Sequence, residues 1–327
     1  MKKSILVYSN GEKIGDGIIK LPLLHEIRRR LKSYEIVWMT DKGSTVYNSV
    51  LKNIANQYID KFFEKADLKP FFWQNISDNY DLNKLKFNYI LDTQKAVIRT
   101  IALKRIKCLK FISATANGFF SDQKIIKKSN KKIRQYYLED IFDLLDVINE
   151  KKADKDFKIK IPSKLKSILN DIFSKNKLYI GIAPGAGEIN KIWPIKKFLK
   201  VAKYFEKQSY NIVFFLGPQE QSIKRKIINS FPNAIFPEEM IKDFSGPEVV
   251  MASTQFLSCA LSNDSGVSHM LSTNYCPLVK LFGPKDANKF TPNLSNLYTI
   301  SSTSFNSNMI EKIPSEFVIN KMNNLLS

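Results

Sequence analysis

The sequence predicts an α/β protein in which two doubly wound domains follow one another along the chain. Short apolar runs rich in β-branched residues alternate with helical patterns, which is typical of a parallel sheet with crossover helices. The alternation comes as two series, and a length of 327 residues suits roughly two domains of about 150 residues each. A Lys- and Asp-rich stretch containing Pro162 separates the series, so we expect one sheet on either side of it.

The first series predicts an N-terminal Rossmann-like domain over residues 1–160. Its expected strands are residues 4–8, 35–39, 88–91 and 108–112. Its expected helices are residues 16–31, 44–55, 95–104 and 134–149. Residues 161–177 are interpreted as a linker that carries one short helix.

The second series predicts a C-terminal Rossmann-like domain over residues 178–312. Its expected strands are residues 178–183, 211–216, 256–261 and 278–282. Its expected helices are residues 195–207, 220–230, 247–253 and 266–273. Residues 313–327 are assigned to a last helix, because Ser315 is a suitable N-cap for an amphipathic segment over residues 316–326.

The charge of the chain favours an acidic partner. Lys and Arg number 51 against 31 Asp and Glu, a net charge of +20, which suits nucleic acid, an acidic membrane face or an acidic substrate. Lys, Asn and Ile are abundant throughout, so composition alone is an alternative explanation for much of the excess. An arginine-rich tail and interleaved basic and aromatic residues are both missing, which argues against nucleic acid.

Cysteine usage and the N-terminal residues indicate a cytoplasmic protein. Cys108, Cys259 and Cys276 form no C-x-x-C pair and are expected to be reduced thiols. The apolar run at residues 5–8 is too short for a signal peptide, and no run approaches the roughly 20 apolar residues of a membrane span.

Two segments of the second series predict a phosphate site. After one expected strand come Pro184, Gly185, Ala186 and Gly187, followed by Lys191. Small residues let backbone N–H groups approach an anion, and a lysine can reach its oxygens. A plain turn is the alternative, since neither a P-loop nor a dinucleotide-binding glycine pattern is present.

The second segment joins an expected strand to a helix through Asp264, Ser265 and Gly266, with His269 one turn later. A phosphate group is stabilised at such a junction by the helix dipole. Asp264 suits sugar hydroxyls better than phosphate, although a helix cap is its alternative role. As a lone histidine, His269 could equally be a core residue. Asp154 and Asp156 form a D-x-D triplet, but no strand delivers them, and we expect no metal site.

These residues, taken in order, resemble glycosyltransferase family 9, the heptosyltransferases of the lipopolysaccharide inner core. The resemblance is carried by Pro184-Gly185-Ala186 with Lys191-x-Trp193-Pro194, by Phe215-Leu-Gly217-Pro218-Gln-Glu220, by Ser262-Asn-Asp264-Ser265-Gly266-x-x-His269, and by Leu281-Phe-Gly283-Pro284-Lys-Asp286. Nearer the N-terminus, Ile14-Gly15-Asp16 and a helix ending in Leu21-Pro22 resemble the family's Gly-Asp loop, and Asp92-Thr-Gln94 resembles its acceptor-facing strand end. Gly187 departs from the family, in which a serine or threonine is common.

The resemblance implies a GT-B architecture, with two Rossmann-like domains facing across a cleft. It implies an inverting, metal-independent transfer without a cofactor, from an ADP-linked sugar such as ADP-heptose. Asp16 would be the general base, although a helix N-cap is its alternative role. The expected donor-binding residues are Gly185, Ala186, Gly187, Lys191, Glu220, Asp264, Ser265, Gly266 and His269.

The acceptor implied by the resemblance is an anionic glycolipid, with Lys95 and Arg99 as its expected contacts. Peripheral contact with the inner face of the cytoplasmic membrane would follow, and the excess of lysine would help docking. A noncatalytic nucleotide- or nucleic-acid-binding α/β protein, or a family member with another sugar donor, remains the alternative.

Overall fold

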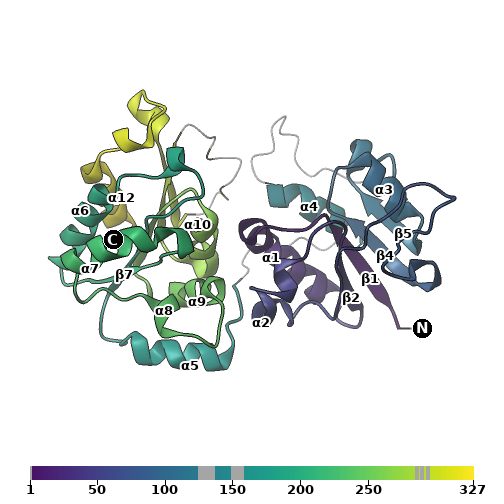
Figure 1. Ribbon diagram of the computed structural model, residues 1–327, viewed down its shortest axis with the longest axis horizontal. Coiled ribbons are helices and arrows are strands. Elements are labelled where there is room, and N and C mark those ends of the chain that lie inside the picture. Colours follow the sequence, from purple (N-terminus) through teal and green to yellow (C-terminus); the bar gives the residue numbers. More distant parts are fainter. Residues whose placement is uncertain (1, 124–136, 149–157, 284–286, 288–290, 292–294) are drawn as a thin grey trace. The chain divides into compact units, whose positions relative to one another are not determined.

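The computed structural model describes residues 2–123, 137–148, 158–283, 287, 291 and 295–327. The chain divides into two compact units, Met1–Phe157 and Lys158–Ser327, each built on a five-stranded sheet (Figure 1). The predicted α/β class with two parallel-sheet domains is confirmed. Asp154, Asp156 and residues 284–286 lie outside the described residues.

The sheet of the first unit has the strand order β3-β2-β1-β4-β5, with every pair parallel. Its strands are β1 (Ser4–Ser9), β2 (Glu35–Thr40), β3 (Lys61–Phe63), β4 (Lys86–Asp92) and β5 (Lys107–Ser113). Its helices are α1 (Ile14–Arg30), α2 (Lys52–Ala55), α3 (Val97–Lys104) and α4 (Tyr137–Asp146). All six residues of the central strand β1 are buried, which explains its unbroken apolar sequence.

Three expectations for the first unit need correction. The helix predicted over residues 44–55 is broken into a 3-10 turn, Val46–Asn48, and the short α2, because Ser49 has non-helical angles. The first helix begins at Ile14 and does not end at Leu21-Pro22, since Pro22 lies inside α1. The strand β3 was not predicted, because it has only three residues and begins with a lysine.

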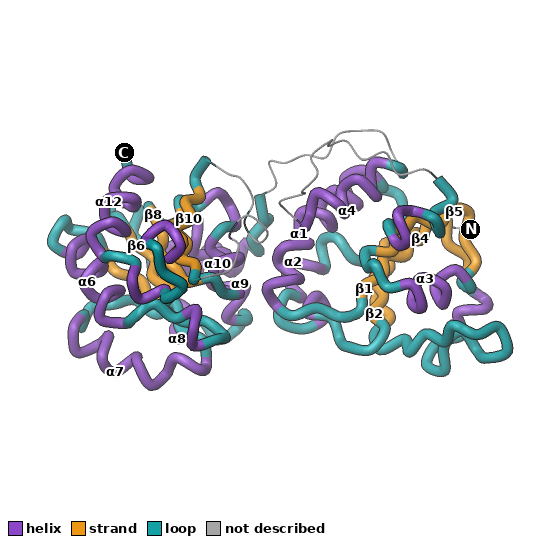
Figure 2. The backbone as a smooth tube through the Cα atoms, turned by 90° about the horizontal axis from the view of Figure 1, so that it is seen from above, coloured by secondary structure: helices purple, strands orange, loops and turns teal. Residues whose placement is uncertain are grey.

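The sheet of the second unit has the order β10-β9-β8-β6-β7, again with parallel pairs. Its strands are β6 (Tyr179–Ala183), β7 (Asn211–Phe214), β8 (Cys259–Asn263), β9 (Leu278–Phe282) and β10 (Leu297–Ser301). Its helices are α5 (Ser163–Ile172), α6 (Ile195–Glu206), α7 (Gln221–Ser230), α8 (Pro237–Met240), α9 (Gly246–Ser253), α10 (Gly266–Leu271) and α12 (Ser315–Leu326). Figure 2 shows the strands of this unit surrounded by helices.

Three assignments in the second unit differ from the expectation. The short helix expected in the linker over residues 161–177 is α5, but α5 packs against α9, so the stretch is part of the second unit. The last helix begins at Ser315, so its N-cap is Pro314. The strand β10 was not predicted.

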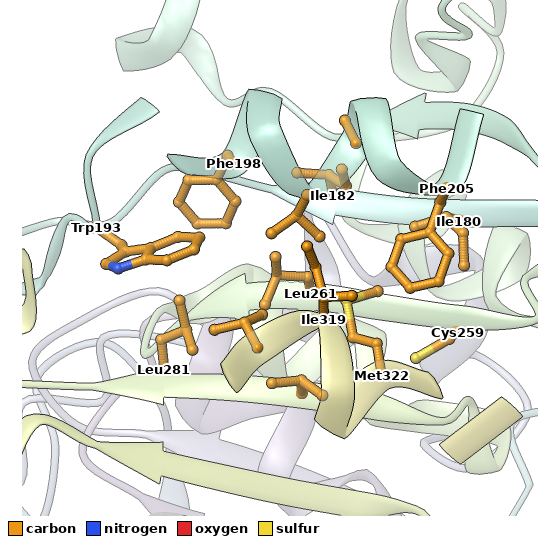
Figure 3. Packing of buried hydrophobic residues seen from close by; sticks show 14 of the residues in the cluster. Ile180, Ile182, Trp193, Phe198, Phe205, Cys259, Leu261, Leu281, Ile319 and Met322 are labelled. Carbon is orange, nitrogen blue, oxygen red and sulfur yellow. The ribbon is translucent and has the colours of Figure 1, made fainter. Parts of the chain in front are cut away.

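The core of the second unit lies between its sheet and the helices α6 and α12. Figure 3 shows Trp193, Phe198, Leu261 and Met322 in this cluster. The indole of Trp193 is fully buried, and its Nε1 donates a hydrogen bond to the carbonyl oxygen of Ile313 over 3.1 Å. The chain segment after β6 is thereby fixed to the segment before α12. None of the helices in the described part of the chain is long and apolar enough to cross a bilayer.

Candidate active site

The loops after β6 and β8 meet where the strand order of the second sheet reverses. β6 and β8 are adjacent, while β7 lies on the other side of β6. In open α/β sheets such a reversal opens a crevice at the carboxyl ends of the strands, where ligands bind. Asn263, the fully buried last residue of β8, joins the two loops: its Nδ2 donates to the oxygen of Pro184 over 2.7 Å, and its Oδ1 accepts from the Trp193 N–H over 3.1 Å.

Three charged side chains form a cluster at this point. The Nζ of Lys191 lies 3.0 Å from Oδ2 of Asp264, and the Nζ of Lys280 lies 3.0 Å from Oδ1 of the same carboxylate. Lys191 also lies 3.5 Å from Oε1 of Glu188. The side chains of Asp264 and Lys280 are only 9% and 3% exposed. One carboxylate thus bridges two ammonium groups in a largely dry environment, which strengthens both interactions.

The cluster shifts the pKa values of its members. Burial would raise the pKa of Asp264, but the charges and hydrogen bonds of Lys280 and Lys191 outweigh it and hold that pKa below its usual value. Burial lowers the pKa of Lys280, and Asp264 offsets part of this effect. Burial and the nearby Lys280 lower the pKa of His269 to about 3. His269 is therefore a neutral imidazole at neutral pH.

Small residues leave room beside the charged cluster. A Cβ atom added at Gly187 or Gly266 would meet nothing within 4 Å. The Oγ of Ser265 is buried and has no hydrogen-bond partner among the described residues. A hydroxyl donor, two open glycines and two lysines together can accommodate an anionic group. Ala186, by contrast, is buried in the loop.

Glu220 connects the loop after β7 with the loop after β6. It ends a 3-10 turn, Pro218–Glu220. Its carboxylate lies so close to Gly185 that a Cβ there would collide with it, and a Cβ at Gly217 would lie 2.6 Å from its Oε2. The two glycines therefore let this carboxylate sit beside the small-residue loop, where it can accept hydrogen bonds from hydroxyl groups.

Asp16 lies in the first unit, in the first turn of α1, and is exposed. Lys13 is the N-cap of α1, so the alternative role of Asp16 as the cap is wrong. The start of α1 is held firmly, since the Tyr47 hydroxyl donates to the oxygen of Gly17 over 2.7 Å. One turn after Asp16, the buried Nζ of Lys20 donates to Oγ of Ser9 over 3.0 Å.

The two expected acceptor contacts have different surroundings. Arg99 is engaged within its own unit: its Nη1 lies 2.9 Å from Oδ2 of the buried Asp41 and donates to the oxygen of Leu68 over 3.0 Å. Lys95 is exposed, three residues after β4. The last residue of β4, Asp92, is buried and accepts hydrogen bonds from Thr100, Ser113 and the Gln94 N–H. Burial raises the pKa of Asp92, although these hydrogen bonds reduce the shift.

The structure brings the expected donor-binding residues together at the carboxyl ends of β6, β7 and β8. Asp16, Lys95 and Arg99 belong to the first unit. Within the described part of the chain, no group of three or more His, Cys, Asp or Glu side chains could hold a metal ion. The sequence interpretation missed Lys280. Its signal was a single lysine inside the apolar strand Leu278–Phe282, which marks a buried charge that needs a partner.

Comparisons with known proteins agree on one family. A model of glycosyltransferase family 9 (heptosyltransferase) matches residues 81–316. Lipopolysaccharide heptosyltransferase 1 of Campylobacter coli is 26% identical over 94% of this chain and 92% of its own length. Lipooligosaccharide heptosyltransferase 2 of Campylobacter jejuni is 23% identical over 85% of this chain and 81% of its own.

Solved structures show the same fold. The glycosyltransferase family 9 protein of Veillonella parvula superimposes with a TM-score of 0.73 at 17% identity, covering 100% of this chain and 98% of the other. E. coli heptosyltransferase WaaC with ADP-2-deoxy-2-fluoro heptose gives a TM-score of 0.69 at 14% identity, covering 98% of this chain and 99% of the other.

Proposed function

Because this chain belongs to glycosyltransferase family 9, the heptosyltransferase family, we propose that it transfers a heptose from ADP-heptose to the inner core of lipopolysaccharide or to a related glycan. The chain is a glycosyltransferase with the GT-B fold. The donor is inferred from relatives named as heptosyltransferases and from the similar WaaC structures, which contain ADP or an ADP-heptose analogue.

The observation that carries the proposal is the cluster of Lys191, Asp264 and Lys280 beside two open glycines. When the donor binds, the ammonium group of Lys191 exchanges its carboxylate partner for a phosphate oxygen. Ser265 and the Gly266 N–H donate to the same diphosphate, and Asp264 accepts from hydroxyl groups of the sugar. Glu220, beside Gly217, accepts from the ribose hydroxyls. Charge-assisted hydrogen bonds of this kind contribute roughly 1.5–3 kcal/mol each.

In the proposed reaction the acceptor hydroxyl attacks the anomeric carbon of the heptose. A new C–O bond forms on one face of the sugar while the bond to the diphosphate breaks on the other, so the configuration inverts. Asp16 takes the proton of the hydroxyl, a contribution of roughly 10²- to 10⁴-fold in rate. Lys191 stabilises the negative charge of the departing ADP, so the transfer proceeds without a metal ion.

The proposed acceptor is an anionic glycolipid at a membrane surface. The exposed Lys95 is its proposed contact, and the net charge of +20 favours association with acidic lipids. Arg99 is the second proposed contact, and its guanidinium is positioned by Asp41 and by the carbonyl oxygen of Leu68.

The donor class is tested by thermal unfolding of the intact chain with ADP-, UDP- and GDP-linked sugars. A ligand at 100 times its dissociation constant adds roughly 2.7 kcal/mol of stability. We expect ADP-heptose to raise the unfolding midpoint most, and Lys191→Ala to abolish most of that rise. A larger rise with a UDP- or GDP-linked sugar would show that the donor is different.

The base is tested by measuring transfer and ADP-heptose binding for Asp16→Ala. We expect transfer to fall roughly 10²- to 10⁴-fold with donor binding largely intact. Lys13→Ala, at the exposed N-cap of α1, where the side chain makes no capping hydrogen bond, is the control and should keep transfer. Equal losses of transfer and binding in Asp16→Ala would exclude a role as base.

A further inference from the structure

The large hydrophobic side chains that the first unit exposes are grouped in one part of its sequence. Among its described residues, all eight such exposed side chains lie between residues 71 and 119. Seven of them make up what we call the α3 face: Phe71, Phe72, Trp73, Val97, Ile98, Ile101 and Phe119. Monomeric proteins seldom expose large apolar side chains together unless they bind something there.

The three segments that carry the α3 face are fastened to one another. Arg99 donates to the oxygen of Leu68 over 3.0 Å, and Arg105 donates to the oxygen of Lys69 over 2.6 Å, so the loop with the three aromatic residues is tied to α3. On the other side of α3, Lys104 donates to the oxygen of Phe120 over 2.8 Å. Figure 1 shows α3 beside β5, the strand that leads to Phe119.

The rings of the aromatic loop contact one another and yet face solvent. The rings of Phe71 and Trp73 stack with centroids 4.8 Å apart, and Phe72 meets Trp73 edge to face at 4.9 Å. Yet the side chains of Phe72 and Trp73 are 86% and 68% exposed. The three rings thus form an apolar projection, and Trp and Phe are residues that enter a membrane interface.

The charge around this projection selects the partner. Residues 93–121 contain six Lys and Arg and no Asp or Glu. Two of the six are paired with carboxylates, Arg99 with Asp41 and Lys104 with Asp122, while Asp67 and Asp78 lie beside Lys69. A second copy of this chain would bring the same basic residues together and be repelled, whereas anionic lipid headgroups would attract them.

We propose that the α3 face binds the surface of an anionic lipid bilayer, with Phe72 and Trp73 entering the interface. α3 starts five residues after the end of β4, and Phe119 follows the end of β5 by six. The start of α3 and Phe119 therefore lie at the carboxyl edge of the first sheet, near Lys95. The loop with Phe72 and Trp73 is instead held by Arg105, just before β5 begins. The relation of the α3 face to the acceptor rests on the proposed function, whereas the lipid binding itself does not depend on the reaction.

Trp73 provides a direct measurement. The indoles of Trp38 and Trp193 are fully buried, so a change in fluorescence on adding vesicles reports Trp73. With vesicles of phosphatidylglycerol and phosphatidylethanolamine, we expect a blue shift and quenching by brominated acyl chains. With pure phosphatidylcholine we expect much weaker binding, since its headgroups carry no net negative charge to attract the basic residues.

Two variants distinguish binding through the α3 face from nonspecific adsorption to vesicles. Phe72→Ser should lower partitioning to the anionic vesicles about tenfold or more. Met309→Ser, which removes a side chain that is 52% exposed on the second unit, should leave partitioning unchanged. Both variants should bind ADP like the unaltered chain, which confirms that each is folded.

The proposal is overturned if Trp73 shows no shift, if Phe72→Ser partitions like the unaltered chain, or if pure phosphatidylcholine binds equally well. Concentration-dependent self-association lost in Phe72→Ser would instead assign the face to a protein contact. Vesicle binding without stabilisation by any nucleotide sugar would count against the proposed function alone. Stabilisation by ADP-heptose without vesicle binding would count against this inference alone.

Discussion

Replacing Asp264 by Asn should destabilise the second unit more than replacing its partner Lys280. The change leaves the ammonium group of Lys280 inside the protein, 3% exposed, without the carboxylate that lies 3.0 Å away. Removing one partner of a buried ion pair typically costs about 3–5 kcal/mol. The lysine can escape by losing its proton, which for an ordinary pKa near 10.4 costs about 4.6 kcal/mol at pH 7. That cost is an upper limit for the charge penalty.

The reverse change, Lys280→Met, should be milder. Asp264 keeps Lys191 at 3.0 Å from its other oxygen, and methionine fills a similar volume. The loss should be about 1.5–3 kcal/mol, the usual value of one charge-assisted hydrogen bond. The double variant Asp264→Asn with Lys280→Met should be about 1–3 kcal/mol more stable than Asp264→Asn alone.

Hydrogen exchange of the amides in β8 and β9, followed with urea in the intact chain, measures the free energy of opening this unit. The loss of stability caused by Asp264→Asn should become smaller between pH 7 and pH 10. Burial holds the pKa of Lys280 low in the folded state. The cost of burying a charged Lys280 therefore disappears as pH rises toward the pKa of lysine in the unfolded chain. Equal losses for the two single variants, or a double variant whose losses simply add, would refute the bridging role of Asp264.

Three further changes test other parts of the structure. Trp193→Phe should lower the free energy of unfolding of the second unit by about 2–4 kcal/mol in urea, because it removes the hydrogen bond to Ile313 and leaves a cavity. The control Trp73→Phe, at a position 68% exposed, should lower it almost not at all. Similar losses for the two variants would contradict the packing of Trp193. Gly17→Ala should destabilise the first unit by about 1–3 kcal/mol, because the new Cβ collides with Val46, and a thermal midpoint equal to that of the unaltered chain would show otherwise. Burial raises the pKa of Asp92 above its unfolded value, so ionisation of Asp92 destabilises the fold as pH rises from about 4. The stability of Asp92→Asn relative to the unaltered chain should therefore improve with pH. A difference in unfolding free energy that stays constant with pH in urea titrations would contradict this.

The strands with long apolar runs could be predicted from the sequence, whereas the breaks and short elements could not. β1 and β8 are buried over their whole length, so their apolar runs could be recognised, although β8 begins at Cys259 and not at residue 256. The single helix predicted over residues 44–55 is wrong because the backbone of Ser49 interrupts it. Tertiary packing, and not local sequence, decides this interruption. β3 exists only because β2 offers an edge with which Lys61–Phe63 can pair.

The candidate site could likewise be predicted only in part. Lys191, Asp264 and Gly266 lie in loops whose composition indicates an anion site, and they could be found by reading along the chain. Lys280 could not be placed, because it meets Asp264 through the register of β8 and β9, in which Ser262 pairs with Lys280. The sequence carries no direct signal for the register of strands joined by a helix. Arg99 was identified as a cation, but only the structure shows that Asp41 holds it.

The carboxylate of Asp264 has one more consequence. Lys191, in the segment after β6, and Lys280, inside β9, carry like charges, and Lys191 lowers the pKa of Lys280. Without an anion between them the segment with Lys191 would be pushed away from β9. Asp264 acts as a built-in counter-ion that keeps the pocket preorganised, so an incoming diphosphate replaces one negative group by another and little ordering entropy is lost on binding.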